Sequence, residues 1–231
     1  MTDENQNQNK WCFAWFAERA AKDNKRAALA RAAQWNSSDR ITVSFLDGDP
    51  TVQSRVRDVA GEWTVPGMAN LSLIFQQNPD SMIRISFLRP GSWSMIGTTC
   101  MQVTDRREPT MNYGWLNADS TDEELHRVVL HEFGHALGLI HEHQSPAEGI
   151  NWDRAAVTRD LSAPPNNWPL DVIETNMFKP FSEAETNFTE LDPQSIMMYP
   201  IPRTWTSDGF SVGLNSNLSE SDKAFIRQTY G

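Results

Sequence analysis

The sequence predicts an α+β fold in which a β-sheet packs on helices. In the first half of the 231-residue chain, short apolar segments typical of strands alternate with segments rich in helix formers. The second half contains many prolines, is rich in loops, and ends in a segment with helical character. A chain of this length can bury a core without help from disulfides or a structural metal.

The expected elements follow one another along the chain. Residues 18–34 are rich in strong helix formers and predict a helix outside the main body. Because proline is favoured in the first turn of a helix, another helix is expected from Pro50 to about Trp63. Strands are expected at residues 41–46, 71–75 and 83–88.

Two more helices are expected further along. One begins near Ser120, where Ser120 or Thr121 can cap it, and Glu123 or Glu124 three residues later would complete a capping box. The last helix is expected at about residues 220–229.

Composition and charge exclude several classes of partner. A net charge of −10 argues against nucleic acid and against an anionic membrane surface, because both are bound through clustered Lys and Arg. No apolar run is long enough for a membrane helix, and no signal peptide is visible. The compartment stays open between the cytoplasm and export without a leader. Cys12 and Cys100 either pair or remain separate thiols.

The chemistry is concentrated in one motif, HExxHxxGxxH, formed by His131, Glu132, His135, Gly138 and His141. His131 and His135 lie about one helical turn apart, so both imidazoles point the same way. Glu132 lies roughly 100° around the helix, beside a metal bound to the histidines. Gly138 can end the helix in a left-handed conformation, after which His141 can return as a third ligand.

Three neutral imidazoles leave a fourth zinc position open for water, which is the pattern of a catalytic zinc site. The alternative is that these are core histidines on a buried helix. Of the two remaining histidines, His126 is expected at the surface or as a cap, and His143 in a solvated loop, although a supporting role near the zinc is open. The neighbouring apolar residues are expected to pack in the core: Leu125, Val129, Phe133, Ala136 and Leu137.

A second motif, residues 195–200 (SIMMYP), lies about 55 residues downstream. Together with the zinc motif it resembles the Met-turn of the metzincin metallopeptidases, with Met197 as its methionine. Residues 91–97 (GSWSMIG), Glu142 and Tyr199 resemble the astacin branch of that clan. The closing segment, residues 218–231, is similar to the last helix of matrixins.

This resemblance implies a zincin-like, metzincin-like architecture, with a twisted mixed β-sheet and long helices in an N-terminal subdomain. A loop-rich C-terminal subdomain then ends in a helix. We therefore expect an N-terminal extension with a helix at residues 1–40, a catalytic subdomain carrying the zinc helix at 41–141, and a C-terminal subdomain at 142–231.

The motif and the resemblance together predict a zinc endopeptidase that binds one Zn²⁺ ion, acts on proteins or peptides, and is a monomer. Glu132 would act as general base toward a water polarised by the metal. Tyr199, by resemblance, would be an extra zinc ligand and stabilise the oxyanion; a merely packed tyrosine is the alternative. Met197, Gly138 and Glu142 would give structural support. Most members of the family are secreted.

Other interpretations are a catalytically silent, zinc-stabilised binding module and a latent peptidase that needs N-terminal processing. Retention of Glu132 favours an active enzyme, because this residue is not a ligand and a silent module could lose it. In matrixins a prosegment cysteine blocks the zinc, but for Cys12 a buried thiol among aromatics is the ordinary explanation. An extended substrate is expected to add to a sheet edge at residues 98–104.

Overall fold

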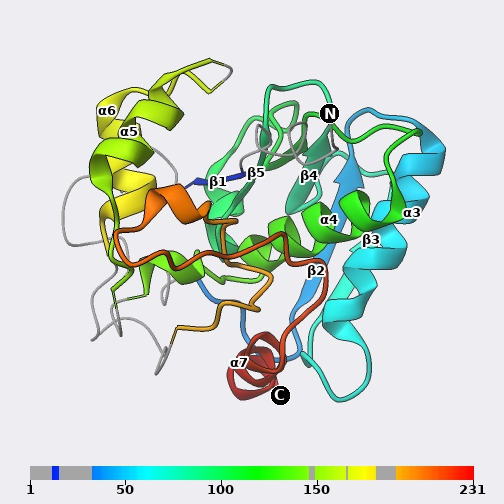
Figure 1. Cartoon of the computed structure of the whole chain (residues 1–231). Coiled ribbons are helices and arrows are strands. Elements are labelled where there is room, and N and C mark those ends of the chain that lie inside the picture. The colour runs from blue at the N-terminus through cyan, green and yellow to red at the C-terminus, as the bar shows by residue number, and fades with distance from the viewer. Residues whose placement is uncertain (1–11, 16–32, 146–148, 165, 181–190) are drawn as a thin grey trace.

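The computed structural model describes residues 12–15, 33–145, 149–164, 166–180 and 191–231 (Figure 1). The helix expected at residues 18–34 lies almost entirely outside this part of the chain and stays a prediction. The structure describes the backbone of the N-terminal strand at residues 12–15 but not the side chain of Cys12.

A mixed sheet forms the centre of the molecule, and its strands are ordered β1-β5-β6-β4-β2-β3. The four strands from β6 to β3 are parallel to one another, β5 is antiparallel to β6, and β1 is parallel to β5. The strands are β1 Cys12–Trp15, β2 Arg40–Phe45, β3 Ser72–Phe75, β4 Ile83–Ser86, β5 Ser92–Met95 and β6 Met111–Tyr113. The predicted α+β fold with a twisted mixed sheet is confirmed, and β2, β3 and β4 lie where strands were expected.

The expectation of a strand at a sheet edge at residues 98–104 is wrong. Residues Gly97–Gln102 form a 3₁₀ helix instead. Gly97 has φ +50, and a Cβ there would lie 1.9 Å from the carbonyl oxygen of Ala33, so only glycine allows this close approach. The N–H of Thr98 donates to the same carbonyl at 2.7 Å. This tertiary contact overrides the strand-like composition, and β5 is the strand beside the zinc-motif helix instead.

Two helices pack against one another beside the sheet. Helix α3 (Pro50–Ala60) has Asp49 as N-cap and continues as the 3₁₀ helix η2 (Gly61–Thr64), as expected for residues 50–63. Helix α4 (Asp122–Ala136) carries the zinc motif. Thr121 caps α4 by accepting the N–H of Glu124, whereas the Ser120 hydroxyl accepts the N–H of Asn117 in the preceding turn.

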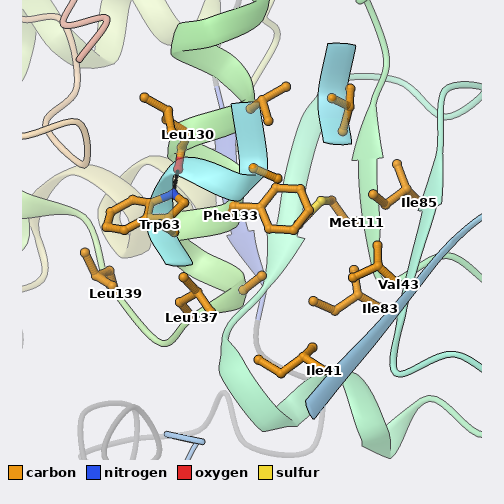
Figure 2. Packing of buried hydrophobic residues seen from close by; sticks show 14 of the residues in the cluster. Ile41, Val43, Trp63, Ile83, Ile85, Met111, Leu130, Phe133, Leu137 and Leu139 are labelled. Carbon is orange, nitrogen blue, oxygen red and sulfur yellow. Dashed lines mark hydrogen bonds between the residues drawn. The ribbon is translucent and has the colours of Figure 1, made fainter. Parts of the chain in front are cut away.

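The main core lies between α4 and the sheet (Figure 2). Phe133 of α4 packs among the sheet residues Val43, Ile85 and Met111, and all of these side chains are buried. The indole N–H of Trp63 donates to the carbonyl of Leu130 at 3.1 Å. The five apolar residues of α4 predicted to pack in the core are all buried there. A rigid, buried helix therefore carries the zinc motif.

The second half has its own core, formed mainly by α5 (Arg154–Ser162), α6 (Leu170–Ile173), a π-helical turn η5 (Glu174–Phe178) and the 3₁₀ helix η7 (Arg203–Trp205). These elements lie to one side of the sheet (Figure 1). A short 3₁₀ helix η4 (Glu142–Gln144) directly follows the zinc motif. The subdomain boundaries at residues 40 and 141 remain a prediction.

Helix α7 (Glu220–Tyr230) closes the chain, as expected from the sequence. The Tyr230 hydroxyl donates to the carbonyl of Leu137 at 2.6 Å, just beyond the end of α4. The last helix is thus joined directly to the zinc-motif helix. Among the described residues no helix is long and apolar enough to cross a membrane.

Candidate metal centre and active site

The end of α4 turns the chain so that a third histidine returns to the first two. Gly138 has φ +98, its N–H donates to the carbonyl of His135 at 2.8 Å, and the N–H of Leu139 donates to that of Gly134 at 3.0 Å. This pair of bonds is a Schellman motif, which requires a left-handed residue after the helix. The chain then reverses and brings His141 back towards α4.

His131, His135 and His141 form a metal-binding group. Their candidate ligand atoms all lie within 4.8 Å of one another, and all three side chains are buried. The Nε2 atoms of His135 and His141 are 3.1 Å apart. Nitrogens that bind one zinc ion at about 2.0–2.1 Å lie at such separations, so the donor set fits a three-histidine zinc site.

Hydrogen bonds to backbone carbonyls fix two of the imidazoles. The Nδ1–H of His131 donates to the carbonyl of Ile196 at 2.7 Å, and that of His135 donates to Leu139 at 2.9 Å. Each bond leaves the Nε2 lone pair free for a metal. The Nε2 atom of His131 is buried and has no hydrogen-bond partner in the described structure. A buried nitrogen without a hydrogen-bond partner is expected where the side chain serves as a metal ligand.

Burial also keeps these imidazoles neutral. Desolvation lowers the pKa of His131 well below its ordinary value, with a further contribution from His135. Desolvation likewise lowers the pKa of His135 to about 4. Neutral imidazole is the form that binds metal, so the site stays competent for zinc at neutral pH.

Glu132 is fully buried and lies directly after His131 on α4. Together with His131 it lines a pocket between α4 and residues 196–200. Tyr199 lines the same pocket, and its ring centroid is 4.2 Å from that of His141. The structure therefore brings the predicted base and the predicted tyrosine to the metal site.

The turn at residues 195–200 packs directly on α4. A Cβ placed on Gly134 would lie 2.4 Å from the sulfur of Met197, so the glycine between the first two histidines leaves room for this methionine. Met197 is buried, and its carbonyl accepts the N–H of Glu142 at 3.1 Å. The turn thus contacts both the helix and the residue after the third histidine.

Asp222 of α7 holds this turn in place. Its carboxylate accepts the hydroxyl of Ser195 at 2.7 Å and the N–H of Ile196 at 2.8 Å, and it also accepts the N–H of Ser219. Because Ile196 in turn orients His131, the last helix reaches the metal site through two hydrogen bonds. Sequence reasoning missed this residue, although the S-x-x-D spacing of a capping box was visible at residues 219–222.

The expectation that His143 lies in a solvated loop is wrong, because its side chain is buried. Its Nε2–H donates to the carbonyl of Asn176 at 2.7 Å, and its ring stacks on Tyr199 with centroids 4.5 Å apart. The side-chain amide of Gln144 donates to the carbonyls of Thr175 and Lys179. The π-helical turn thus anchors the segment that follows the third histidine, and π-helical turns are frequent at functional sites.

Glu142 and His126 occupy other environments. Glu142 is buried, and desolvation raises the pKa of its carboxyl to about 7, against the lowering effect of the N–H of Asp192, which it accepts at 2.9 Å. His126 is half-buried, and its ring lies between the Glu62 carboxylate and the carbonyl of Ser216. Cys100 is a free, buried thiol.

The chain is similar to two solved structures of myroilysin. One is 40% identical, with a TM-score of 0.83 over 87% of this chain and 97% of that chain. The other is 36% identical, with a TM-score of 0.71 over 97% and 92%. High choriolytic enzyme 1, a hatching-enzyme zinc-protease from the medaka fish Oryzias latipes, shares the fold at 17% identity and a TM-score of 0.53, over 84% and 92%. No protein-family model and no curated protein sequence matches the chain.

The fold and the three-histidine group define a zinc metallopeptidase. Through its identity to myroilysin, the chain belongs to the astacin-like metallopeptidases of the metzincin clan. Its cofactor is one zinc ion, and its substrates are proteins or peptides.

Proposed function

We propose that the protein is an endopeptidase that hydrolyses internal peptide bonds, with Glu132 as general base. The observation that carries this proposal is the convergence of three buried imidazoles beside a buried glutamate that lines the adjoining pocket. His131, His135 and His141 would hold the zinc. The metal, when bound, supplies a Lewis acid that polarises water and the scissile carbonyl.

Glu132 has the position that proton transfer requires. It follows a ligand directly, so its carboxylate lies beside the metal position without taking a ligand place. The carboxylate would accept a proton from the attacking water and later deliver it to the leaving amine. The amine side of the scissile bond therefore lies next to Glu132.

Tyr199 would stabilise the negative charge that develops on the carbonyl oxygen. Its ring packs against the rings of both His141 and His143, which also stack on one another, so two neighbours restrict its orientation. Met197 and Gly138 would act through structure alone, the first by packing under the imidazoles and the second by reversing the chain. Glu142 would tie the third histidine to the segment around Asp192.

The test compares the wild type with Glu132→Ala in cleavage of casein, alongside zinc content by elemental analysis. We expect cleavage by the wild type only and about one zinc ion in each protein. Equal cleavage by both would refute the role of Glu132. Two zinc-loaded but inactive proteins would instead favour a silent binding module or a latent form.

A latent form has specific support. An extended substrate can add only to a free strand edge, and the edge of β5, beside α4, is paired with β1 in parallel register. Residues 12–15 would therefore have to leave before a substrate could bind there. We expect a chain that begins at Ala33 to cleave casein faster than the full chain. Equal rates would refute latency, and Cys12→Ala in the full chain separates an effect of the thiol from one of the strand.

A further inference from the structure

His126 joins the zinc-motif helix α4 to a neighbouring segment of the chain through both of its ring nitrogens. Its Nδ1 atom lies 2.5 Å from the carbonyl oxygen of Ser216, and its Nε2 atom lies 2.7 Å from a carboxylate oxygen of Glu62. Both neighbours are acceptors. A neutral imidazole has one N–H, so it can donate to only one of them and turns a lone pair towards the other. The doubly protonated ring donates to both, so the contacts fit the imidazolium form of His126.

The charged groups around this ring come from three elements. Glu62 belongs to the 3₁₀ helix η2, and the cavity beside His126 is lined by further charged side chains: Arg55 and Asp58 of α3, and Asp122 and Glu123 of α4. Among the described residues that line this cavity, Arg55 is the only cation besides the histidine, and it pairs with Asp122 at 2.7 Å. Arg127, the next residue on α4, lines the pocket beside Glu132 instead. The ring therefore meets no cation whose charge is not balanced by a carboxylate.

The segment that His126 contacts, residues 214–217, forms a wall shared by two cavities. Its first two residues line the pocket beside Glu132, and its last two line the cavity beside His126. The side-chain amide of Asn215 donates to the carbonyls of Pro193 and Ser195, each at 2.8 Å. The segment is thus attached to the 195–200 turn through Asn215 and to α4 through His126.

We propose that His126 is a positioning residue for the substrate pocket, because its doubly protonated ring holds the 214–217 segment against α4. Leu214, which is 39% exposed, is the apolar contact that this segment offers to a substrate. The inference rests on the proposed function, since it takes the pocket beside Glu132 as the place where a substrate side chain binds. Loss of one proton from the ring removes one of its two donors, so substrate binding should weaken as the pH rises.

The test has an NMR arm and a kinetic arm, both on the zinc-loaded protein in the form that is active on casein. Nitrogen-15 shifts of the imidazoles, followed between about pH 5 and 9, report whether His126 carries one proton or two, and His126→Gln identifies its signals. Steady-state rates on a blocked peptide with leucine after the scissile bond give kcat and KM over the same range.

Two variants separate the contact from the charge. In Glu62→Gln the side-chain amide can donate to a neutral ring, so both contacts of His126 persist without the second proton. Glu123→Gln is the matched control, because it removes a negative charge from the same cavity but leaves the carboxylate that His126 contacts. His126→Arg supplies donors to both acceptors and keeps its charge at every pH tested.

We expect the KM of the wild type to rise about 2- to 5-fold over the pH range in which the ring loses its second proton. This rise should be absent in Glu62→Gln and in His126→Arg, and present in Glu123→Gln. The pH dependence of kcat should stay that of the wild type in all three variants, because the metal and Glu132 are unchanged.

Each outcome decides a separate question. A ring with a single proton throughout this range, or a rise in KM that persists in Glu62→Gln, overturns this inference and leaves the endopeptidase proposal standing. Loss of the second proton without any change in KM also overturns it, because the contact then does not affect the pocket. Failure of the wild type to cleave casein or any peptide refutes the proposed function itself, and with it the role of His126 in substrate binding.

Discussion

Gly134 offers a test of how the 195–200 turn is seated on the zinc helix. In an exposed helix interior, replacing glycine by alanine stabilises by about 1 kcal/mol. At Gly134 the new Cβ would lie 2.4 Å from the sulfur of Met197 and 3.3 Å from the ring of Trp63. Ordinary contacts are about 3.5–4.0 Å, so the methionine must move by more than 1 Å.

The structure makes that movement costly. Met197 is buried, and its backbone is held by Ser195 and Glu142. Overpacking of a filled core costs about 1–3 kcal/mol. After subtraction of the gain of about 1 kcal/mol from helix propensity, we expect Gly134→Ala to lower the free energy of unfolding by up to about 2 kcal/mol.

Urea unfolding of the zinc-loaded protein, followed by circular dichroism, measures this change. Gly61→Ala is the matched control, because Gly61 has an ordinary helical conformation and nothing lies within 4 Å of its added Cβ. That variant should be neutral or more stable by up to about 1 kcal/mol. If Gly134→Ala is stabilised to the same extent, the packing argument is wrong.

Three further predictions concern the support of the site. Asp222→Asn should destabilise the fold by about 1–3 kcal/mol and weaken zinc binding about 10-fold, as measured by chelator competition. Unchanged zinc affinity would contradict the argument that Asp222 supports His131 through the backbone of Ile196. Burial raises the pKa of the Cys100 thiol to about 12, so in a Cys12→Ser background this thiol should resist alkylation at pH 8 until the protein unfolds. The contribution of the buried thiol to stability should be present below pH 9 and lost as the pH rises towards 12. Rapid alkylation of the folded protein would count against this burial. Removal of zinc should lower the unfolding midpoint, and zinc restored at 100 times its Kd should recover about 2.7 kcal/mol; equal midpoints would mean that the folded state binds no metal.

The local parts of this protein could be predicted from its sequence. The helix that carries His131 and His135 follows from periodicity and capping, and Gly138 marks its end, because these signals act over a few residues. The strands β5 and β6 were missed because they are only four and three residues long and show no clear alternation.

The features that could not be predicted from the sequence depend on contacts between segments that lie far apart in the chain. The 3₁₀ helix at Gly97 depends on the carbonyl of Ala33, and the burial of His143 depends on a π-helical turn more than 30 residues away. The role of Asp222 depends on a contact across 26 residues. Neither periodicity nor propensity carries information on which distant segments meet.

The contact between α7 and the 195–200 turn has a consequence for the order in which the enzyme forms during synthesis. The ribosome adds about 5–20 residues each second, and Asp222 follows His131 by about 90 residues, so the first ligand emerges about 5 to 20 s before the residue that completes its support. The nascent chain therefore carries zinc-binding histidines well before it carries a fully positioned centre. A ribosome stalled before α7 would hold a chain that binds metal weakly and cleaves poorly.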